Sequence, residues 1–70
     1  MLFHVVLETD EDGFVVAECP ALPGCVTQGQ TELEAMENIK EAIQAWLWAE
    51  DEKHTREVMA QGKLPVLVAI

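Results

Sequence analysis

Basic residues are scarce in this chain of 70 residues, which has four Lys and Arg against 13 Asp and Glu and a formal net charge of −9. A surface of that sign repels a phosphate backbone, so we expect no direct binding of nucleic acid. The charge has two interpretations. It steers the chain toward a basic protein partner, or it serves solubility alone.

Long hydrophobic runs are also absent, since no apolar stretch approaches the roughly 20 residues of a membrane span. The longest, Leu64–Ile70, is interrupted by Pro65. The first residues lack the basic region and cleavage site of a signal peptide, so we expect a cytoplasmic protein. We expect a single domain over residues 1–70, too small to be very stable without a disulfide, a metal or a second subunit.

Groups that carry catalysis or bind metal are few. The two cysteines, Cys19 and Cys25, and the two histidines do not have the spacing of a structural zinc site. A disulfide between the cysteines is geometrically possible, but free thiols are favoured in a cytoplasmic chain. The acidic run Asp10–Asp12 lacks the ligand pattern of a calcium loop and is interpreted as a solvated turn. We therefore predict no enzyme, no cofactor and no metal.

Two runs rich in Val, Leu and Phe, Leu2–Glu8 and Phe14–Cys19, flank an acidic turn that ends in Gly13 and predict a β-hairpin. A turn over Asp10–Gly13 places Thr9 opposite Phe14 and Leu7 opposite Val16. One face of this hairpin then carries Phe3, Val5, Leu7, Phe14 and Val16, and the other carries His4, Val6, Val15, Ala17 and Cys19. Because both faces are apolar near the middle, we expect both to be covered.

The stretch PALPGCVTQGQTELEA, residues 20–35, is dense in backbone signals. Pro23 and Gly24 suit the centre of a type II turn, with Gly24 at the position of positive φ. A third strand over Cys25–Gln28 follows and is ended by Gly29. We interpret this stretch as a folding element that leads the chain from hairpin to helix.

Thr31 and Glu34 form the capping-box pattern of a helix start. A helix is expected from Glu32 to about Ala49, with Leu33, Met36, Ile39, Ile43, Trp46 and Leu47 on its apolar face. The segment Glu50–Lys63 either extends this helix or forms a short turn of its own. Leu64–Ile70 predicts a last strand, in which Pro65 is tolerated at an edge.

Trp48 falls on the polar face of the helix, together with Glu34, Glu37, Glu41 and Gln44. Because Trp is enriched in interaction hot spots, this set is a candidate partner-binding surface. The alternative is packing of Trp48 inside the chain, under a folded-back Glu50–Gly62, or against a second subunit.

The element order is therefore strand, strand, strand, helix, strand: an α+β fold with three antiparallel strands, one long helix packed on the sheet and a C-terminal strand. A single helix covers only one face of a small sheet. We therefore expect a homodimer or a higher homo-oligomer.

The run from Asp10 to Ile43 resembles the HicB family of type II antitoxins. The resemblance covers about residues 3–48 and is carried by D-x-D-G, P-x-L-P-G-C, G-x-T-x-x-E-A and the helix sequence N-I-K-E-A-I. The motif positions are Gly13, Pro23, Gly24, Cys25, Gly29, Thr31 and Glu34. The resemblance implies a fold like part of ribonuclease H, oligomeric assembly, and a HicA toxin partner: a small basic protein that cleaves mRNA and whose active surface the antitoxin covers.

Two departures from the family pattern matter. Gln30 stands where the family more often has Asp, which we expect to change a loop contact and not the fold. Full-length family members usually carry a C-terminal DNA-binding domain, and we expect none in residues 1–70. The ribonuclease-like activity does not carry over, because no carboxylate lies in the middle of the first strand.

The functional hypothesis is a non-catalytic, antitoxin-like protein that masks a small basic RNA-cleaving toxin of HicA type. The alternative is a stand-alone oligomeric scaffold or small-ligand-binding protein with no toxin partner.

Overall fold

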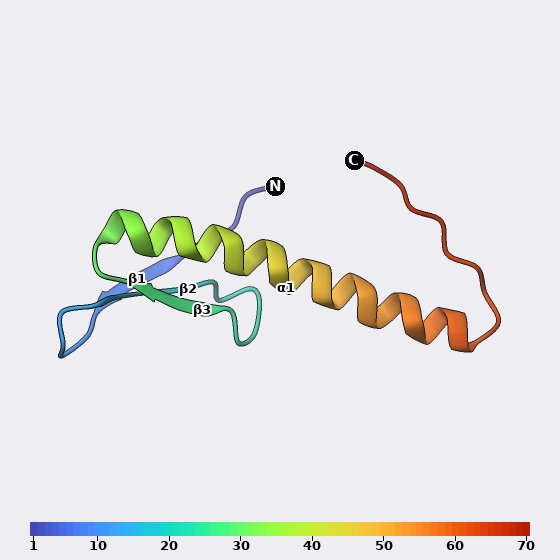
Figure 1. Cartoon of the computed structure of the whole chain (residues 1–70), viewed down its shortest axis with the longest axis horizontal. Helices are drawn as coiled ribbons and strands as arrows, with labels where there is room; N and C mark the ends of the chain where they lie inside the picture. Colours follow the sequence, from blue (N-terminus) through green and yellow to red (C-terminus); the bar gives the residue numbers. More distant parts are fainter.

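The computed structural model describes residues 1–70 and contains three strands and one helix. In chain order these are β1 (Val6–Thr9), β2 (Val15–Glu18), β3 (Val26–Gly29) and α1 (Glu32–Ala60). The sheet has the order β1-β2-β3, with both pairs antiparallel. α1 lies along one face of the sheet and extends far beyond it (Figure 1). The predicted α+β fold is confirmed.

The hairpin between β1 and β2 differs from the prediction by one residue in register, because Leu7 lies opposite Ala17 and Thr9 opposite Val15. The Asp10 N–H donates to the Phe14 carbonyl oxygen at 2.8 Å, which leaves a loop of only three residues. Gly13 ends this loop with a φ of +86°, as in three-residue hairpins that close on a left-handed glycine. The Asp10 Oδ1 atom accepts from the N–H groups of Asp12 and Phe14, both at 2.9 Å.

This register changes which side chains share a face of the sheet, so the prediction of two apolar faces was wrong. Phe3, Val5, Leu7, Val15, Ala17 and Cys19 belong to the core under α1. By alternation along the strands, the opposite face carries Val6, Glu8, Val16, Glu18, Val26 and Gln28. That second face is a mixture of valines and polar groups.

The loop between β2 and β3 consists of two consecutive turns. The Leu22 N–H donates to the Cys19 carbonyl oxygen at 3.1 Å, and the Cys25 N–H donates to the Leu22 carbonyl oxygen at 3.0 Å. Gly24 has a φ of +80°, which confirms the predicted turn around Pro23 and Gly24. Leu22, Cys19 and Cys25 are buried beneath the loop, so this stretch supplies part of the core.

Thr31 caps α1 as predicted, since its Oγ1 atom accepts from the Glu34 N–H at 3.1 Å. The Glu34 carboxylate accepts from the Gln30 N–H at 3.3 Å, one residue earlier than in an ideal capping box. β3 runs one residue later than expected and ends at Gly29. A Cβ atom at Gly29 would lie 2.5 Å from the backbone nitrogen of Ala35, so the strand and the first turn of the helix approach closely.

The core-facing residues of α1 only partly match the predicted apolar face. Ala35 and Ile39 are buried, and Ala42, Ile43, Trp46 and Leu47 pack partly buried against the core. Leu33, assigned to that face, is 71% exposed. The close approach at Gly29 turns the small Ala35 toward the sheet, and Leu33 lies on another side of the helix as a result.

α1 continues unbroken to Ala60, so Glu50–Lys63 extends the helix instead of forming a separate turn. Gly62, with a φ of +82°, ends it. The Gly62 N–H donates to the Met59 carbonyl oxygen at 3.0 Å and the Lys63 N–H to that of Val58 at 3.1 Å, the two bonds of a Schellman motif.

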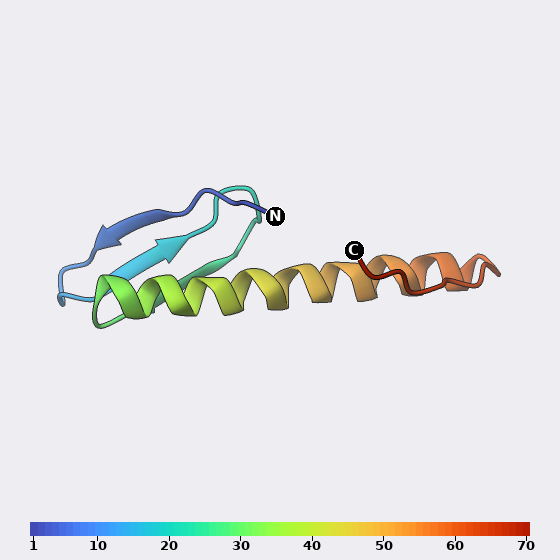
Figure 2. The same ribbon diagram turned by 90° about the horizontal axis from the view of Figure 1, so that it is seen from above.

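The predicted last strand does not form in this structure, and every residue from Leu64 to Ile70 is exposed. The segment turns back beside the far half of α1, away from the sheet (Figures 1 and 2). The reason is geometric: α1 carries the chain beyond the sheet edge before this segment begins. The likeness to ribonuclease H, which includes that strand, is not confirmed.

Candidate protein-binding surface

The predicted site residues share one exposed face of α1. Glu34, Glu37, Glu41, Gln44 and Trp48 recur every three or four residues, which aligns them along the helix, and all five are exposed. We refer to these five residues as the acidic stripe. The buried Ala35 and Ile39 lie on the other side of α1, against the sheet.

The carboxylates of the stripe differ in what they contact. Glu34 is committed to the helix start, through its bond with the Gln30 N–H. The ion pairs of the structure involve Glu50, Glu52 and Glu57, and none involves Glu37 or Glu41. Glu37 and Glu41 therefore keep their full capacity to accept hydrogen bonds from another molecule.

Trp48 lies at the end of the stripe, and 63% of its surface is exposed. The prediction that Glu50–Gly62 folds back over it is wrong, because that segment continues the helix. Shallow depressions beside Trp48 are bordered by Glu52, Arg56 and Met59. The Arg56 Nη2 atom lies 3.4 Å from the Glu52 Oε2 atom. Leu67 of the final segment borders one of these depressions, yet it leaves Trp48 exposed, so a partner protein or a second copy could cover this side chain.

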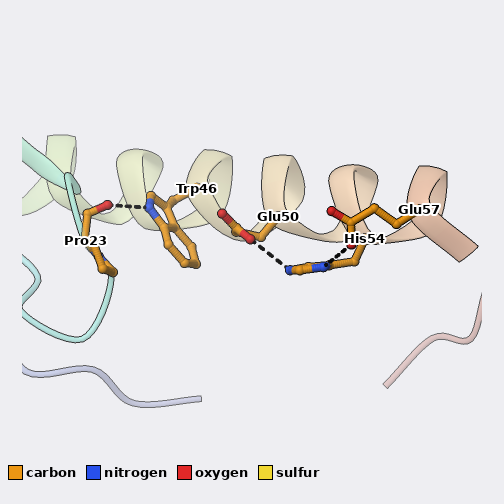
Figure 3. A network of polar contacts seen from close by, with 5 residues as sticks. All are labelled: Pro23, Trp46, Glu50, His54 and Glu57. Atoms are coloured by element: carbon orange, nitrogen blue, oxygen red, sulfur yellow. Dashed lines mark hydrogen bonds and ion pairs between the residues drawn. The ribbon is translucent and has the colours of Figure 1, made fainter.

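Trp46, two residues earlier, has the opposite environment. Its Nε1–H donates to the Pro23 carbonyl oxygen at 2.9 Å, which ties the loop between β2 and β3 to the middle of α1 (Figure 3). The sequence predicted Trp46 on the apolar face but did not reveal this bond, because 23 residues separate the two partners.

His54 lies between two carboxylates on the distal half of α1 (Figure 3). Its Nε2 atom is 3.1 Å from Glu50 Oε2 and its Nδ1 atom is 3.2 Å from Glu57 Oε2. Sequence reasoning considered His54 as a zinc ligand and missed these contacts. The spacing of four and three residues on a helix was the signal for this cluster.

The remaining reactive groups have structural surroundings. No group of three or more His, Cys, Asp or Glu side chains is arranged to hold a metal ion. Cys19 and Cys25 are free and buried. Burial, and then the neighbouring Cys19, raise the pKa of the Cys25 thiol, which makes it a poor nucleophile at neutral pH. α1 also has no stretch apolar enough to span a lipid bilayer.

The family model for the HicB-like antitoxin of bacterial toxin-antitoxin systems matches residues 3–65. The chain belongs to this antitoxin family. The match extends beyond the motif-rich region into the distal half of α1 and the start of the exposed final segment. No solved structure matches this chain.

Several relatives of this chain are named UPF0150 proteins. One from Thermoplasma acidophilum is 55% identical over 47 residues, which cover 67% of this chain and 68% of the relative. One from Synechocystis is 39% identical over 64 residues, covering 91% and 93% of the two chains. One from Helicobacter pylori is 51% identical over 47 residues, covering 67% and 64%.

Proposed function

We propose that this HicB-like antitoxin is a non-catalytic protein that binds and masks a small basic RNA-cleaving toxin of HicA type. The observation that carries the proposal is Trp48, a large aromatic side chain left 63% exposed at the end of the acidic stripe. Membership of the antitoxin family and the net charge of −9 support the same partner class.

In the proposed mechanism, the carboxylates of this chain compete with the phosphates of RNA for the basic surface of the toxin. A protein that cleaves RNA needs a basic surface to hold the phosphate backbone. Glu37 and Glu41, which have no intramolecular ion pair, offer carboxylates to that surface in place of phosphates. The long-range attraction between the two proteins also raises the rate of encounter.

Trp48 contributes affinity in this mechanism, while the carboxylates contribute rate and orientation. A buried indole removes a large apolar area from water and keeps an N–H for a polar partner. Such side chains dominate the binding energy at the centre of many interfaces.

The test first looks beside this gene for a reading frame that encodes a small basic protein, and then measures binding of that protein by isothermal titration calorimetry. We expect the double variant Trp48→Ala, Glu41→Lys to weaken binding by roughly 30-fold or more, as hot-spot truncations do. Glu11→Lys is the matched control, since it makes the same charge change on the exposed hairpin loop. Equal affinities for the double variant and the control would remove the acidic stripe from the interface.

A second candidate function is a stand-alone oligomeric scaffold without a toxin. The small enclosed core favours it, because Ile39 and Cys19 are the largest side chains that are fully buried. The neighbouring genes distinguish the two functions. An antitoxin has an adjacent gene for a small basic protein that inhibits growth, and co-expression of this chain relieves that inhibition. A scaffold has no such gene.

A further inference from the structure

The core of the single chain is open along β1. α1 packs mainly on β3 and β2, and seen from above it leaves β1 at the far side of the sheet (Figure 2). A groove of about 410 Å³ lies between the start of the chain and α1. Its apolar lining includes Leu2, Phe3, Val5, Met36, Ile43 and Leu47.

The outer edge of β1 is unpaired, whereas that of β3 is partly blocked. On β3, the Val26 N–H donates to the Gly24 carbonyl oxygen at 3.1 Å, and the Asn38 Nδ2 donates to the Gln28 carbonyl oxygen at 2.8 Å. α1 thus occupies the β3 edge with one of its own side chains.

On β1, antiparallel pairing alternates between residues that bond to the neighbouring strand and residues that do not. Asp10 bonds to Phe14 across the hairpin, so the alternation places Val6 and Glu8 in bonded pairs with β2. The backbone groups of Leu7 and Thr9 point outward. They offer a template for one more strand.

The final segment, Leu64–Ile70, has the composition of a β-strand but pairs with no other strand. Leu64–Ile70 carries no charge and includes three β-branched residues. Leu64, Val66, Leu67 and Val68 are each between 79% and 92% exposed. Such a continuous apolar segment is costly to leave in water.

The segment cannot pair along the whole of β1 in its own chain. Trp46 is tied to the loop at the near end of the sheet, and α1 then continues for about 21 Å at 1.5 Å per residue to Ala60. To pair with all of β1, the segment would have to extend at least about 34 Å back from the end of α1, past the edge of the sheet to the far end of β1. Lys63–Ile70, fully extended, spans only about 26 Å.

We propose that Leu64–Ile70 of one copy adds as a fourth strand to the free edge of β1 in a second copy, and that the exchange is reciprocal. This one contact pairs the free edge of β1, closes the apolar groove and buries the exposed segment. In the added strand, Leu64, Val66, Val68 and Ile70 share a face and close the groove, while Pro65, Leu67 and Ala69 face away. Pro65 lies near the start of the strand, where its missing N–H is tolerated.

Sedimentation equilibrium over a concentration series tests the assembly. We expect the full chain to form a dimer of twice the 7.8 kDa of one chain. Val68→Asp should raise the dimer dissociation constant at least about tenfold, because it places a charge in the groove. Ala69→Asp is the matched control and should have a clearly smaller effect, although both residues are exposed in the single chain. A monomeric wild-type chain, or a dimer that both substitutions affect equally, overturns the proposal.

Amide hydrogen exchange and NMR give a readout that needs no variant. In the dimer, the Leu7 and Thr9 amides should be protected, and an equal mixture of labelled and unlabelled chains should show contacts between Val66 or Val68 and β1 across the two copies. A dimer without these contacts uses another surface, which also overturns the proposal.

Discussion

At Gly29, β3 passes so close to the first turn of α1 that no side chain fits. A Cβ there would meet backbone atoms of Glu34 and Ala35 at 2.5 to 3.0 Å. Backbone atoms in a capped first turn cannot move aside as a flexible side chain can. This residue therefore sets the distance between the sheet and the helix.

We predict that Gly29→Ala lowers the free energy of unfolding by about 2 kcal/mol or more, the cost of overpacking in a rigid site. The measurement is urea denaturation followed by circular dichroism. The exposed neighbour Gln30→Ala should change the same quantity by less than about 0.5 kcal/mol. Similar losses for both variants would contradict the close approach.

The buried thiol of Cys25 links stability to alkaline pH. Its pKa is raised in the folded chain by burial and by Cys19, so the unfolded chain loses the proton first as pH rises. The contribution of the neutral thiol is therefore complete below the unfolded thiol pKa, near 8.5, and is lost as pH rises toward the folded pKa.

The chain has no Tyr, so the effect of Cys25 is followed between about pH 8 and 9.5, around the ordinary thiol pKa. We predict that the melting temperature falls across this range in the wild type and falls less steeply in Cys25→Ala. Differential scanning calorimetry at a series of pH values measures both slopes. Parallel slopes would show that Cys25 is not the linked group.

Among the elements, α1 divides into two halves with different support. Glu32–Leu47 packs on the sheet and is tied to the loop through Trp46. Trp48–Ala60 has no sheet beneath it and is held by exposed pairs such as those of His54. Such pairs contribute only about 0.3–0.5 kcal/mol each, and isolated helices of this length are marginal in water. The distal half is therefore the part of α1 that gains most from a partner.

The bond from Trp46 to Pro23 should contribute about 1 kcal/mol to stability, the net value of a typical hydrogen bond. We predict that Trp46→Phe, which keeps an aromatic ring but removes the donor, lowers the free energy of unfolding by about that amount. Trp48→Phe is the matched control, since Trp48 is 63% exposed. Urea denaturation followed by circular dichroism compares them, and equal stabilities would mean that the bond contributes nothing.

The whole molecule is more elongated than a compact domain of 70 residues. Its radius of gyration is 15.6 Å and its extents are 50 × 22 × 16 Å, whereas a compact domain of this size has a radius near 11 Å. The excess comes from the distal half of α1 and the segment beside it (Figure 2). So elongated a single chain encloses little core, and the strand exchange proposed above would supply contacts that the single chain lacks.

The charged and uncharged surfaces lie on different parts of the whole molecule. The acidic stripe lies along α1, while the proposed exchange involves an uncharged segment at the edge of β1. The two proposed contacts meet only at their margins, where Gln44 of the stripe lines the groove and Leu67 of the segment borders the depression beside Trp48. Val68 and Glu41, the residues changed in the proposed variants, are not among these shared residues.

The sequence by itself determined the local features: the turn at Pro23 and Gly24, the helix start at Thr31, the order of the first four elements and the alignment of the acidic stripe. Each depends on residues within a few positions of one another, through a permitted φ, a capping bond or the helical repeat. Local chemistry of this kind is visible in the sequence because the interacting groups are neighbours in it.

The tertiary structure decided the rest. The hairpin register followed from one fewer residue in the loop, and the rotation of α1 followed from the contact between Gly29 and Ala35, not from the largest apolar residues. The position of Leu64–Ile70 followed from the length of α1, which separates a strand-like segment from its own sheet. These outcomes depend on how segments distant in the chain pack against each other, and no local pattern contains that information.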